Sequence, residues 1–455
     1  MANSGKKIAV IGAGIIGVNC AYQLQKSGYQ VTLIDKSGVA EGCSKGNAGH
    51  FATEQVFPLA DSSLLSQLPK MLLDPLGPIA LSPRYTPKVL PWFIRFFNQM
   101  RPSKFSHNQS ALTTLNQSAI NAYEVLLEEI GAEHLLTKNG SFLVFEHPSV
   151  KSAEKVATHY KNANIELELI SGEQARSLEP SLSENIQHAI WFKDVGHTFS
   201  PFELTKVIAD AAFKLGAAFE QSTVRAVEHH GQVSNSNDDD RITLVLEEKR
   251  MQFDQVIVAT GGYSKSLVES IGYQLPIEVE RGYSFDLSIN PNTHDTKPAH
   301  EKDHGQTSET ARNTYANSRL KRPVASAERK FIITPMQDAG NNILRLSGTV
   351  EFAGLDAPAN MKRASLLHNH AKEILQQLPT APTNNENKWM GFRPSLPDSL
   401  PVMCQAPRHK GLYFCLGHQH LGLTQGAISG LLMKQLIAGE ATTIDLTPFN
   451  ISRFN

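Results

Sequence analysis

Apolar and polar positions near the start of the chain predict a strand, a turn, a helix and a second strand. Residues 7–11 form a short apolar run that is typical of a buried strand. A helical pattern then continues to Gly28, where a helix can end because glycine tolerates a positive φ. Residues 30–34 form the second apolar run, and Asp35 stands at its carboxyl end. The pattern predicts a βαβ-type unit with parallel strands.

Helical and strand-like patterns both continue along the rest of the chain. Residues 60–105 are rich in leucine and proline and predict short helices. Further helices are predicted at residues 106–135, 201–215 and about 422–438. Strands are predicted at residues 141–146, 165–170, 223–228, 241–247, 255–260, 342–351 and 411–416. Residues 289–323 have no hydrophobic period, and a loop of that length is typical of a functional lid or a disordered insertion.

Composition excludes several classes of protein. The 455 residues carry 43 basic and 44 acidic side chains, and a formal net charge of −1 argues against a protein that coats nucleic acid. A chain of this length predicts two or three domains. Its four cysteines are far apart, which fits neither a disulfide framework nor a metal site and suits a reducing cytosol. No stretch reaches the length of a membrane span and no signal peptide is recognisable, so we expect a cytoplasmic protein or one peripheral to the inner face of a membrane.

The glycine-rich turn at residues 12–17 carries the first chemical signal. Gly12 permits the tight turn, Gly14 lets backbone N–H groups approach a pyrophosphate, and Gly17 lets the helix pack closely on the strand. The positive end of the helix then faces the anion. Asp35 can accept hydrogen bonds from ribose hydroxyls. The sequence therefore predicts a dinucleotide-binding turn.

Two later segments favour a flavin dinucleotide. Residues 256–262 form a buried strand that ends in Ala-Thr-Gly-Gly, and a strand of this kind paired with the first motif resembles flavoproteins, in which the cofactor is FAD. Residues 413–424 predict a strand that leads into a helix N-terminus. Its backbone N–H groups and dipole would face an anionic centre, such as the N1–C2=O edge of a reduced flavin.

Taken together, these motifs resemble the D-amino-acid oxidase and dehydrogenase superfamily of FAD enzymes. The closest resemblance is to bacterial D-amino-acid dehydrogenases, and it extends over nearly the whole chain. The segments that carry it are residues 12–17, 43–50, 259–264, 281–284, 389–394 with 397–398, and 417–424. Three features depart from the pattern: His50 replaces a usual Gln, Leu423 replaces a usual Trp, and the 289–323 segment is longer. The run at 422–426 looks more like members that act on cyclic imino acids such as D-hydroxyproline.

The resemblance implies an α/β fold with two domains whose segments are interleaved. The Rossmann-like FAD-binding domain would comprise residues 1–58, 196–270 and 400–455. The mixed-sheet substrate-binding domain would comprise residues 59–195 and 271–399, with the polar insertion at 289–323.

The resemblance also implies the residues that contact the cofactor. These are Gly12, Gly14, Ile15, Ile16, Gly17, Asp35, Lys36, Ser44, Asn47, Ala48, Gly49, His50, Val224, Ala259, Thr260, Gly261, Gly417, His418, Leu421, Gly422, Leu423 and Thr424. A sarcosine-oxidase-like anchor cysteine would fall close to Phe392, where the sequence has none, so we expect noncovalent FAD.

Four residues are predicted to act on the substrate. Arg393 is expected to bind the substrate carboxylate, because a guanidinium is a planar, permanently charged fork that donates two parallel hydrogen bonds. Tyr283 would add a hydroxyl donor to the same carboxylate. His420 would bind substrate or shape the pocket over the flavin, and His50 would approach the isoalloxazine. Each competes with a structural role: an ion pair for the arginine, and packing for the others.

The function implied is oxidation of a D-amino acid or cyclic imino acid. Hydride transfer from Cα to flavin N5 would give an imine, which water hydrolyses to a keto acid and ammonia; alignment would do most of the catalysis. The alternatives are a glycine- or sarcosine-type amine oxidase and an inactive flavin-fold binding protein. The electron acceptor, either O2 or a quinone of the respiratory chain, stays open. A stripe at Trp92, Phe93, Phe96, Phe97 and Met100 is either core or a peripheral membrane contact.

Overall fold

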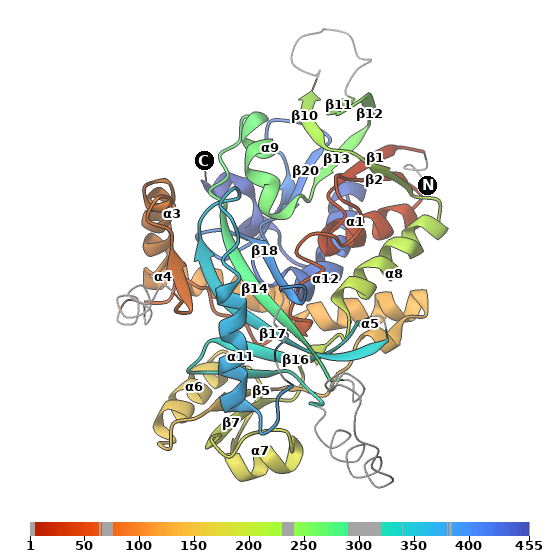
Figure 1. Ribbon diagram of the computed structural model, residues 1–455. Coiled ribbons are helices and arrows are strands. Elements are labelled where there is room, and N and C mark those ends of the chain that lie inside the picture. The colour runs from red at the N-terminus through yellow and green to blue at the C-terminus, as the bar shows by residue number, and fades with distance from the viewer. Residues whose placement is uncertain are drawn as a thin grey trace, which may run out of the picture.

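Two large β-sheets organise the chain in the computed structural model (Figure 1). The structure describes residues 5–62, 65, 76–229, 241–289, 320–338, 340–379, 381 and 385–454. Most of the polar insertion predicted at 289–323 lies outside these residues. Among the described helices, none is long and apolar enough to cross a membrane.

The first sheet has six strands and carries the predicted βαβ unit. β1 (Lys7–Ile11) pairs in parallel with β2 (Gln30–Asp35) on one side and with β13 (Gln255–Val258) on the other. The strand order is β19 (Val402–Gln405), β20 (Leu412–Leu416), β13, β1, β2 and β9 (Ala218–Gln221). All pairs are parallel except β19 with β20. β1 therefore has the next strand of the chain, β2, on one side and the much later β13 on the other. Because the strand order changes direction at this point, ligands are expected at the carboxyl ends of β1 and β13.

Helices cover both faces of this sheet because its central strands are apolar throughout. Only the first residue of β1 is exposed, as expected for a parallel strand buried on both sides. One face packs against α1 (Ile15–Lys26), α8 (Pro201–Lys214), α5 (Ala119–Ile130) and α12 (Gly422–Ala438). The other face packs against α9 (Ser264–Ser270) and the antiparallel sheet of β10 (Val224–His229), β11 (Ile242–Leu246) and β12 (Arg250–Phe253).

The second sheet is mixed and has nine strands. Its order is β18 (Lys388–Ser395), β14 (Glu278–Ser288), β17 (Asn341–Phe352), β16 (Phe331–Asp338), β15 (Val324–Ser326), β5 (Ser141–Phe145), β7 (His188–Phe192) and β6 (Glu168–Ser171), with β4 (Ile79–Leu81) beside β17. The helices α6 (Lys151–Asn162), α7 (Gly172–Leu178) and α11 (Lys362–Ile374) lie around it. The segments of this sheet come from distant parts of the chain, which agrees with the mixed α/β class predicted from the sequence.

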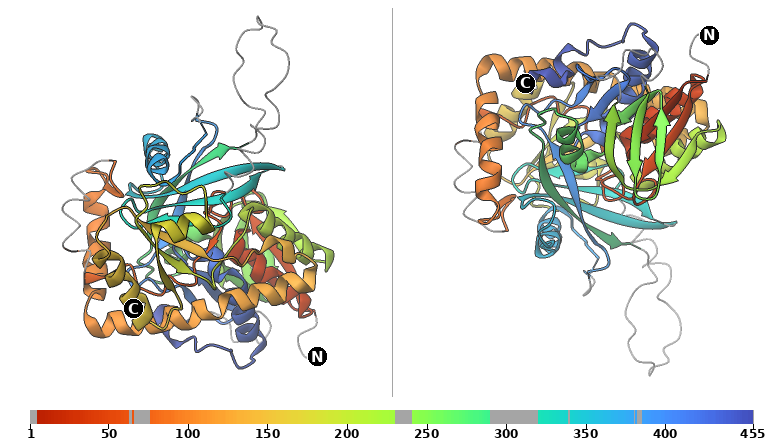
Figure 2. Two further views of the ribbon diagram at one scale, coloured as in Figure 1. Left: turned by 90° about the horizontal axis from the view of Figure 1, so that it is seen from below. Right: turned by 90° about the horizontal axis from the view of Figure 1, so that it is seen from above.

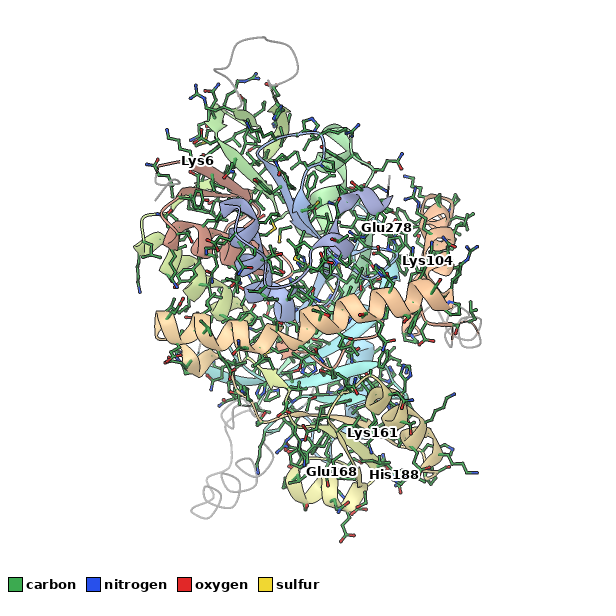
Figure 3. The ribbon with its side chains drawn as sticks, turned by 180° about the vertical axis from the view of Figure 1, so that it is seen from behind. Lys6, Lys104, Lys161, Glu168, His188 and Glu278 are labelled. Carbon is green, nitrogen blue, oxygen red and sulfur yellow. The ribbon has the colours of Figure 1, made fainter. Side chains whose placement is uncertain are left out.

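A run of helices at the side of the molecule connects the part built on the six-stranded sheet with the part built on the nine-stranded sheet. α4 (Pro102–Gln117) and α5 follow one another across it, with Lys104 at one end, as Figure 3 shows from behind. In both views of Figure 2, α3 (Thr86–Gln99) forms a corner with α4 at the edge of the molecule. The small sheet of β3 (His50–Phe51) and β8 (Gly196–His197) lies against α12.

Candidate active site

The glycine turn after β1 needs glycine at two positions. Gly12 has φ +107°, and a Cβ there would lie 2.4 Å from the carbonyl oxygen of Ala259, which follows β13. A Cβ on Gly17 would lie 1.8 Å from the carbonyl oxygen of Gly12. No side chain fits at that distance, so the turn, helix α1 and β13 approach closely only because these residues are glycines. The roles predicted for the tight turn and the close helix packing agree with this geometry.

Side chains from two neighbouring loops close around the turn. The Ser44 hydroxyl accepts a hydrogen bond from the N–H of Ile15 at 3.0 Å, at the first turn of α1. One Asp35 oxygen accepts from the N–H of Ala13 at 2.9 Å. The other Asp35 oxygen accepts from the N–H of Ser37 at 2.8 Å. The structure therefore brings Asp35 and Ser44, both predicted to contact the cofactor, to the same turn.

At two helix N-termini of this site, the residue that precedes the helix provides no side-chain cap, although Ser44 accepts one N–H of α1. Neither Gly14, which precedes α1, nor Leu421, which precedes α12, offers a side-chain acceptor, and neither helix has an acidic residue in its first turn. Free N–H groups and the helix dipole together favour an anion. The pyrophosphate of FAD is an anion, and the N1–C2=O edge of its flavin becomes anionic on reduction, so the donor set fits the expected cofactor.

The remaining predicted cofactor residues lie at the same edge of the six-stranded sheet. Ala259 donates to the Ile11 carbonyl at 2.8 Å, and the loop before Val224 contacts Asp35 through a 3.0 Å bond from the N–H of Ser222. Lys36 stacks its ammonium over the Tyr263 ring at 3.6 Å. The segments brought together here comprise residues 12–17, 35–36, 44–50, 259–261 and 417–424. Their individual contacts with FAD stay predictions.

The loop between β20 and α12 is held against β18. Gln419, at φ +51°, donates its backbone N–H to the Pro394 carbonyl at 3.2 Å and its side-chain amide to the Leu396 carbonyl at 3.0 Å. His418 is buried and contacts the Ser429 hydroxyl at 3.0 Å. Burial lowers the pKa of His418 to about 3, so this ring is neutral. The tethers place the N-terminus of α12 beside the strand that carries Arg393.

Arg393 lies on β18, opposite Glu280 of β14. Its guanidinium covers Gly282, where a Cβ would lie 2.4 Å from the guanidinium carbon. Among the described residues it makes one hydrogen bond, at 3.4 Å to the Thr349 carbonyl, and no ion pair. Burial lowers the pKa of Arg393, while the charge of Glu280 acts in the opposite direction. A partly buried guanidinium with unused donors is suited to binding a carboxylate.

The structure does not bring Tyr283 to Arg393. Side chains alternate along a strand, so Tyr283 and Gly282 point to opposite faces of β14. The Tyr283 hydroxyl donates to Glu351 at 2.6 Å and accepts from the N–H of Asn360 at 3.1 Å. Burial and the bond to Glu351 raise the pKa of Tyr283 to about 12. These contacts are structural, and none supports the predicted role of this tyrosine in binding the substrate carboxylate.

His50 forms a buried pair that the sequence analysis did not identify. Its Nε2 lies 2.9 Å from an oxygen of Glu54, which is 4% exposed. His50 also pairs across the small sheet with His197, a fully buried histidine whose two ring nitrogens have no hydrogen-bond partner among the described residues. The one sequence signal for Glu54 was its position four residues after His50, since a carboxylate in so apolar a segment needs a partner.

His420 is close to these charged groups. Burial lowers the pKa of His420 to about 4, the charges of Arg393 and His50 add to this shift, and Glu54 opposes it. The ring is therefore neutral near pH 7. His420, His50 and Arg393, all predicted to act on the substrate, thus lie within electrostatic range of one another.

Cys43 lies next to Phe392 in the structure, although the two residues are 349 positions apart in the sequence. Its thiol donates to the Phe392 carbonyl at 2.8 Å. The absence of a cysteine beside Phe392 in the sequence therefore does not exclude a thiol there. Although the residue as a whole is exposed, burial of its sulfur raises the pKa of Cys43 to about 11. A protonated thiol is a poor nucleophile, and on that ground noncovalent FAD stays the prediction.

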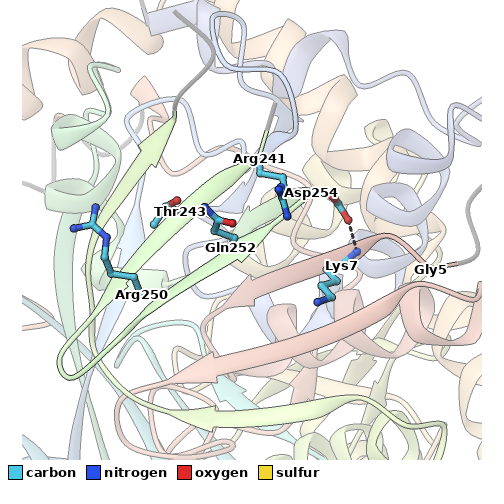
Figure 4. Close-up of a pocket in the computed structure, with 7 residues that line it drawn as sticks. All are labelled: Gly5, Lys7, Arg241, Thr243, Arg250, Gln252 and Asp254. Atoms are coloured by element: carbon cyan, nitrogen blue, oxygen red, sulfur yellow. Dashed lines mark hydrogen bonds between the residues drawn. The ribbon is translucent and has the colours of Figure 1, made fainter. Parts of the chain in front are cut away.

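A separate polar pocket opens at the opposite end of β1 (Figure 4). It is lined by Gly5, Lys7, Arg241, Thr243, Arg250, Gln252 and Asp254. Asp254 accepts a hydrogen bond from the N–H of Lys7 at 2.7 Å. Lys7 begins β1, whereas the glycine turn follows its other end, so this pocket is not the dinucleotide site.

Comparisons with known proteins agree with the site. The family model described as FAD dependent oxidoreductase (DAO) matches residues 7–436. A D-amino-acid oxidase of Bradyrhizobium diazoefficiens is 30% identical over 454 residues, which cover 99% of each chain. A D-amino acid dehydrogenase of Sinorhizobium medicae is 27% identical and covers 98% of this chain and 100% of its own. The crystal structure of glycine oxidase from Geobacillus kaustophilus shares the fold, with a TM-score of 0.71, 19% identity and 99% of each chain covered.

Proposed function

This chain belongs to the DAO family of FAD-dependent oxidoreductases, and we propose that it oxidises a D-amino acid or a cyclic imino acid at its Cα. It is an amino-acid oxidoreductase that uses FAD. The choice of the D-enantiomer follows the names of the curated relatives. The inclusion of cyclic imino acids follows the 422–426 segment.

Arg393 carries the proposal. An amino acid always offers a carboxylate, and a partly buried guanidinium without an ion pair among the described residues is the group that would bind it most strongly. The loop that Gln419 anchors to β18 keeps the N-terminus of α12 beside this strand. The substrate carboxylate would therefore be held close to the cofactor segments.

The residues of this chain would bind FAD, orient the substrate and line the space around it. The glycine turn and Ser44 would hold the pyrophosphate, Asp35 the ribose, and the first turn of α12 the flavin ring. Bound FAD supplies the acceptor for the hydride that leaves Cα. Arg393 would fix the carboxylate, and neutral His420 would line the space beside it without adding a second charge. Water then converts the imine product to a keto acid and ammonia.

A panel of substrates tests the proposal. The purified holoenzyme is mixed without oxygen with D-alanine, D-proline, D-hydroxyproline, their L-enantiomers, glycine and sarcosine, and the visible absorbance of FAD is followed. We expect bleaching by at least one D-amino or D-imino acid, and at most weak bleaching by the others. Preferential bleaching by glycine, sarcosine or an L-enantiomer contradicts the proposed substrate class, and no bleaching by any of them favours an inactive flavin-binding protein.

We further propose that α3 contacts an anionic membrane surface and so brings the enzyme to a membrane electron acceptor. Trp92 and Phe96 are buried, and Trp92 packs on both Phe96 and Phe352, so one side of the helix is core. Its outer side exposes Leu90 (53%), Ile94 (63%) and Phe97 (41%). The exposed cations around this stripe are Arg84, Lys88, Arg95 and Arg101, and residues 76–123 contain no Asp or Glu. An apolar stripe with flanking cations is typical of a helix that lies in an anionic interface.

A further inference from the structure

Glu54 is a buried carboxylate with one free oxygen. Only 4% of the residue is exposed. Its Oε1 contacts His50 Nε2 at 2.9 Å and accepts from the Gln55 amide at 3.4 Å. Its Oε2 is buried and has no hydrogen-bond partner in the described part of the chain. Because a buried carboxyl oxygen without a hydrogen-bond partner is costly, this oxygen indicates a ligand group that bonds to it.

The groups around Glu54 do not supply that donor. His50 and Gln55 contact Glu54 directly, and Tyr160 and His420 lie within electrostatic range of it. His197 and Arg393 belong to the same neighbourhood, because His197 lies within electrostatic range of His50 and Arg393 within that of His420. His50 already uses its Nε2 on the other oxygen, and the Tyr160 hydroxyl bonds to Gln55 at 3.3 Å. Arg393 forms no ion pair with Glu54. His197 and His420 are neutral, since burial lowers the pKa of each to about 4.

Three hydrogen bonds hold the segment of Glu54 at the N-terminal turn of α12. The Thr424 hydroxyl, in the first turn of α12, accepts from the N–H of Ala52 at 2.9 Å. Asn116 donates to the Gln55 carbonyl at 3.0 Å and in turn accepts from the Gln425 amide at 2.9 Å. The loop before α12 is bonded to β18, the strand of Arg393. The segments of Glu54 and Arg393 are thus both bonded to the region where α12 begins, and both residues lie within electrostatic range of His420.

An amino acid has the matching pair of charges on a single carbon. If Arg393 binds the carboxylate, the ammonium group requires an anionic acceptor nearby. That nitrogen must also lose a proton before the Cα–H bond can break, because its electron pair forms the C=N bond of the product. A buried carboxylate that is positioned but not fully hydrogen-bonded is suited to both tasks.

We propose that Glu54 binds the substrate ammonium group and accepts its proton, while His50 positions the carboxylate. This inference rests on the proposed function. In the step, an N–H bond of the ammonium breaks, its electron pair stays on nitrogen, and the proton joins the free oxygen of Glu54. No electrons are transferred and no bond to carbon changes. Glu54 is then a catalytic residue and His50 a positioning residue.

The test compares Glu54→Gln and Glu54→Asp with Glu124→Gln as a control. Glu124 is an exposed acid on α5 that pairs with Lys138 and takes no part in the site. Every variant is first checked for FAD content and melting temperature. Calorimetry of the holoenzyme then measures binding of 2-aminoisobutyrate, which has a carboxylate and an ammonium but no Cα–H, and of isobutyrate, which lacks the ammonium.

Glu54→Gln should weaken 2-aminoisobutyrate about tenfold or more and leave isobutyrate unchanged. With an oxidisable substrate, anaerobic FAD bleaching in this variant should slow by roughly 100-fold at neutral pH. It should recover by about tenfold per pH unit as the pH approaches the pKa of the substrate ammonium, because more substrate is then already neutral. Glu54→Asp retains the carboxylate and should keep the pH profile of the wild type at a lower rate, and Glu124→Gln should match the wild type.

Equal losses for both ligands in Glu54→Gln, or a wild-type pH profile in that variant, would overturn the inference. These results are separable from failure of the proposed function. If the proposed function is wrong, the wild type itself should neither bind 2-aminoisobutyrate nor show FAD bleaching with any amino or imino acid.

Discussion

At the scale of single residues, the site combines one partly buried guanidinium with one buried carboxyl group. Arg393 has unused donors and Glu54 has an unused acceptor oxygen. Each is costly to bury alone, and their cost is reduced when a zwitterion binds between them. This pairing explains why the protein would select amino acids over simple carboxylates or amines.

Replacement of Arg393 should separate substrate binding from cofactor binding. In Arg393→Ala the substrate carboxylate loses a bidentate, charge-assisted partner, so KM should rise by about 100-fold while FAD stays bound. Arg393→Lys keeps the charge but not the planar fork, and its KM should lie between the values of the wild type and of Arg393→Ala. Steady-state kinetics with an artificial electron acceptor, together with the flavin-to-protein ratio, provide the measurement. An unchanged KM in the alanine variant would show that the carboxylate binds elsewhere.

His197 should make the fold sensitive to acid. Burial, with the charges of His50 and Arg322, lowers its pKa from 6.5 to about 4, so the unfolded chain binds the proton more tightly than the native one. Stability therefore falls as the pH decreases from 6.5 towards 4. His197→Phe keeps a ring beside Phe199 without titrating, and should remove about 2 kcal/mol of this loss. Urea unfolding of the wild type and of His197→Phe at pH 7 and pH 4.5 measures the loss of stability. An equal loss in the two proteins would contradict this role of His197.

Residues with a motif around them could be predicted from the sequence, and residues without one could not. Arg393 and His420 lie in recognisable runs and are found near each other. Glu54 belongs to no such run, and its importance is visible only from its burial and its free oxygen. Tyr283 lies in a family-like run, but alternation along β14 turns its hydroxyl to Glu351. A motif therefore identifies a strand more safely than the direction of each side chain on it.

At the scale of elements, the first turn depends on the contact between α1 and β1. Gly17→Ala would put a methyl group 1.8 Å from the Gly12 carbonyl, where backbone must move. We expect loss of FAD binding and destabilisation by about 3 kcal/mol. Gly42→Ala is the matched control, since nothing lies within 4 Å of its Cβ position. Flavin content and thermal melting of both variants test this, and a Gly17→Ala protein that retains FAD with a wild-type melting temperature would contradict it.

Helix α3 should determine whether the protein binds lipid. Ile94→Asp puts a charge into the exposed apolar stripe and should weaken binding to anionic vesicles by more than about tenfold. Val125→Asp, at an exposed apolar position on α5, should have no effect. Vesicle sedimentation at low and high salt is the measurement. Equal binding of both variants, or no binding of the wild type, would rule out the proposed surface.

Element boundaries were predicted best where glycine or a buried apolar run marks them. The strand predicted at 7–11 and the helix predicted at about 422–438 are confirmed as β1 and α12. The strand predicted at 165–170 begins later, as β6 (Glu168–Ser171), because its first residues pack at the edge of the sheet rather than pair. The aromatic stripe near Trp92 divides between core and surface, and periodicity alone does not tell which side of such a helix is covered.

At the scale of the whole molecule, the site forms where two sheets meet through one helix. α12 follows the last strand pair of the six-stranded sheet, and the loop before it is bonded to β18 at the edge of the nine-stranded sheet. The mixed α/β class could be predicted from the order of patterns along the chain. The strand order of the nine-stranded sheet could not, because β14 pairs with β18, more than a hundred residues away, and no local pattern encodes such pairing. The interleaved domain boundaries at 58, 195, 270 and 399 stay a prediction.

The most direct test of the central claim is the absorption spectrum of the holoenzyme during titration with a carboxylate that it cannot oxidise. If Arg393 binds carboxylates beside the flavin, isobutyrate should perturb the FAD spectrum saturably in the wild type. In Arg393→Ala with full FAD content, the perturbation should require about 100-fold more ligand. The same perturbation at the same concentration in both proteins would contradict the account, because the carboxylate site and the flavin would then not meet at Arg393.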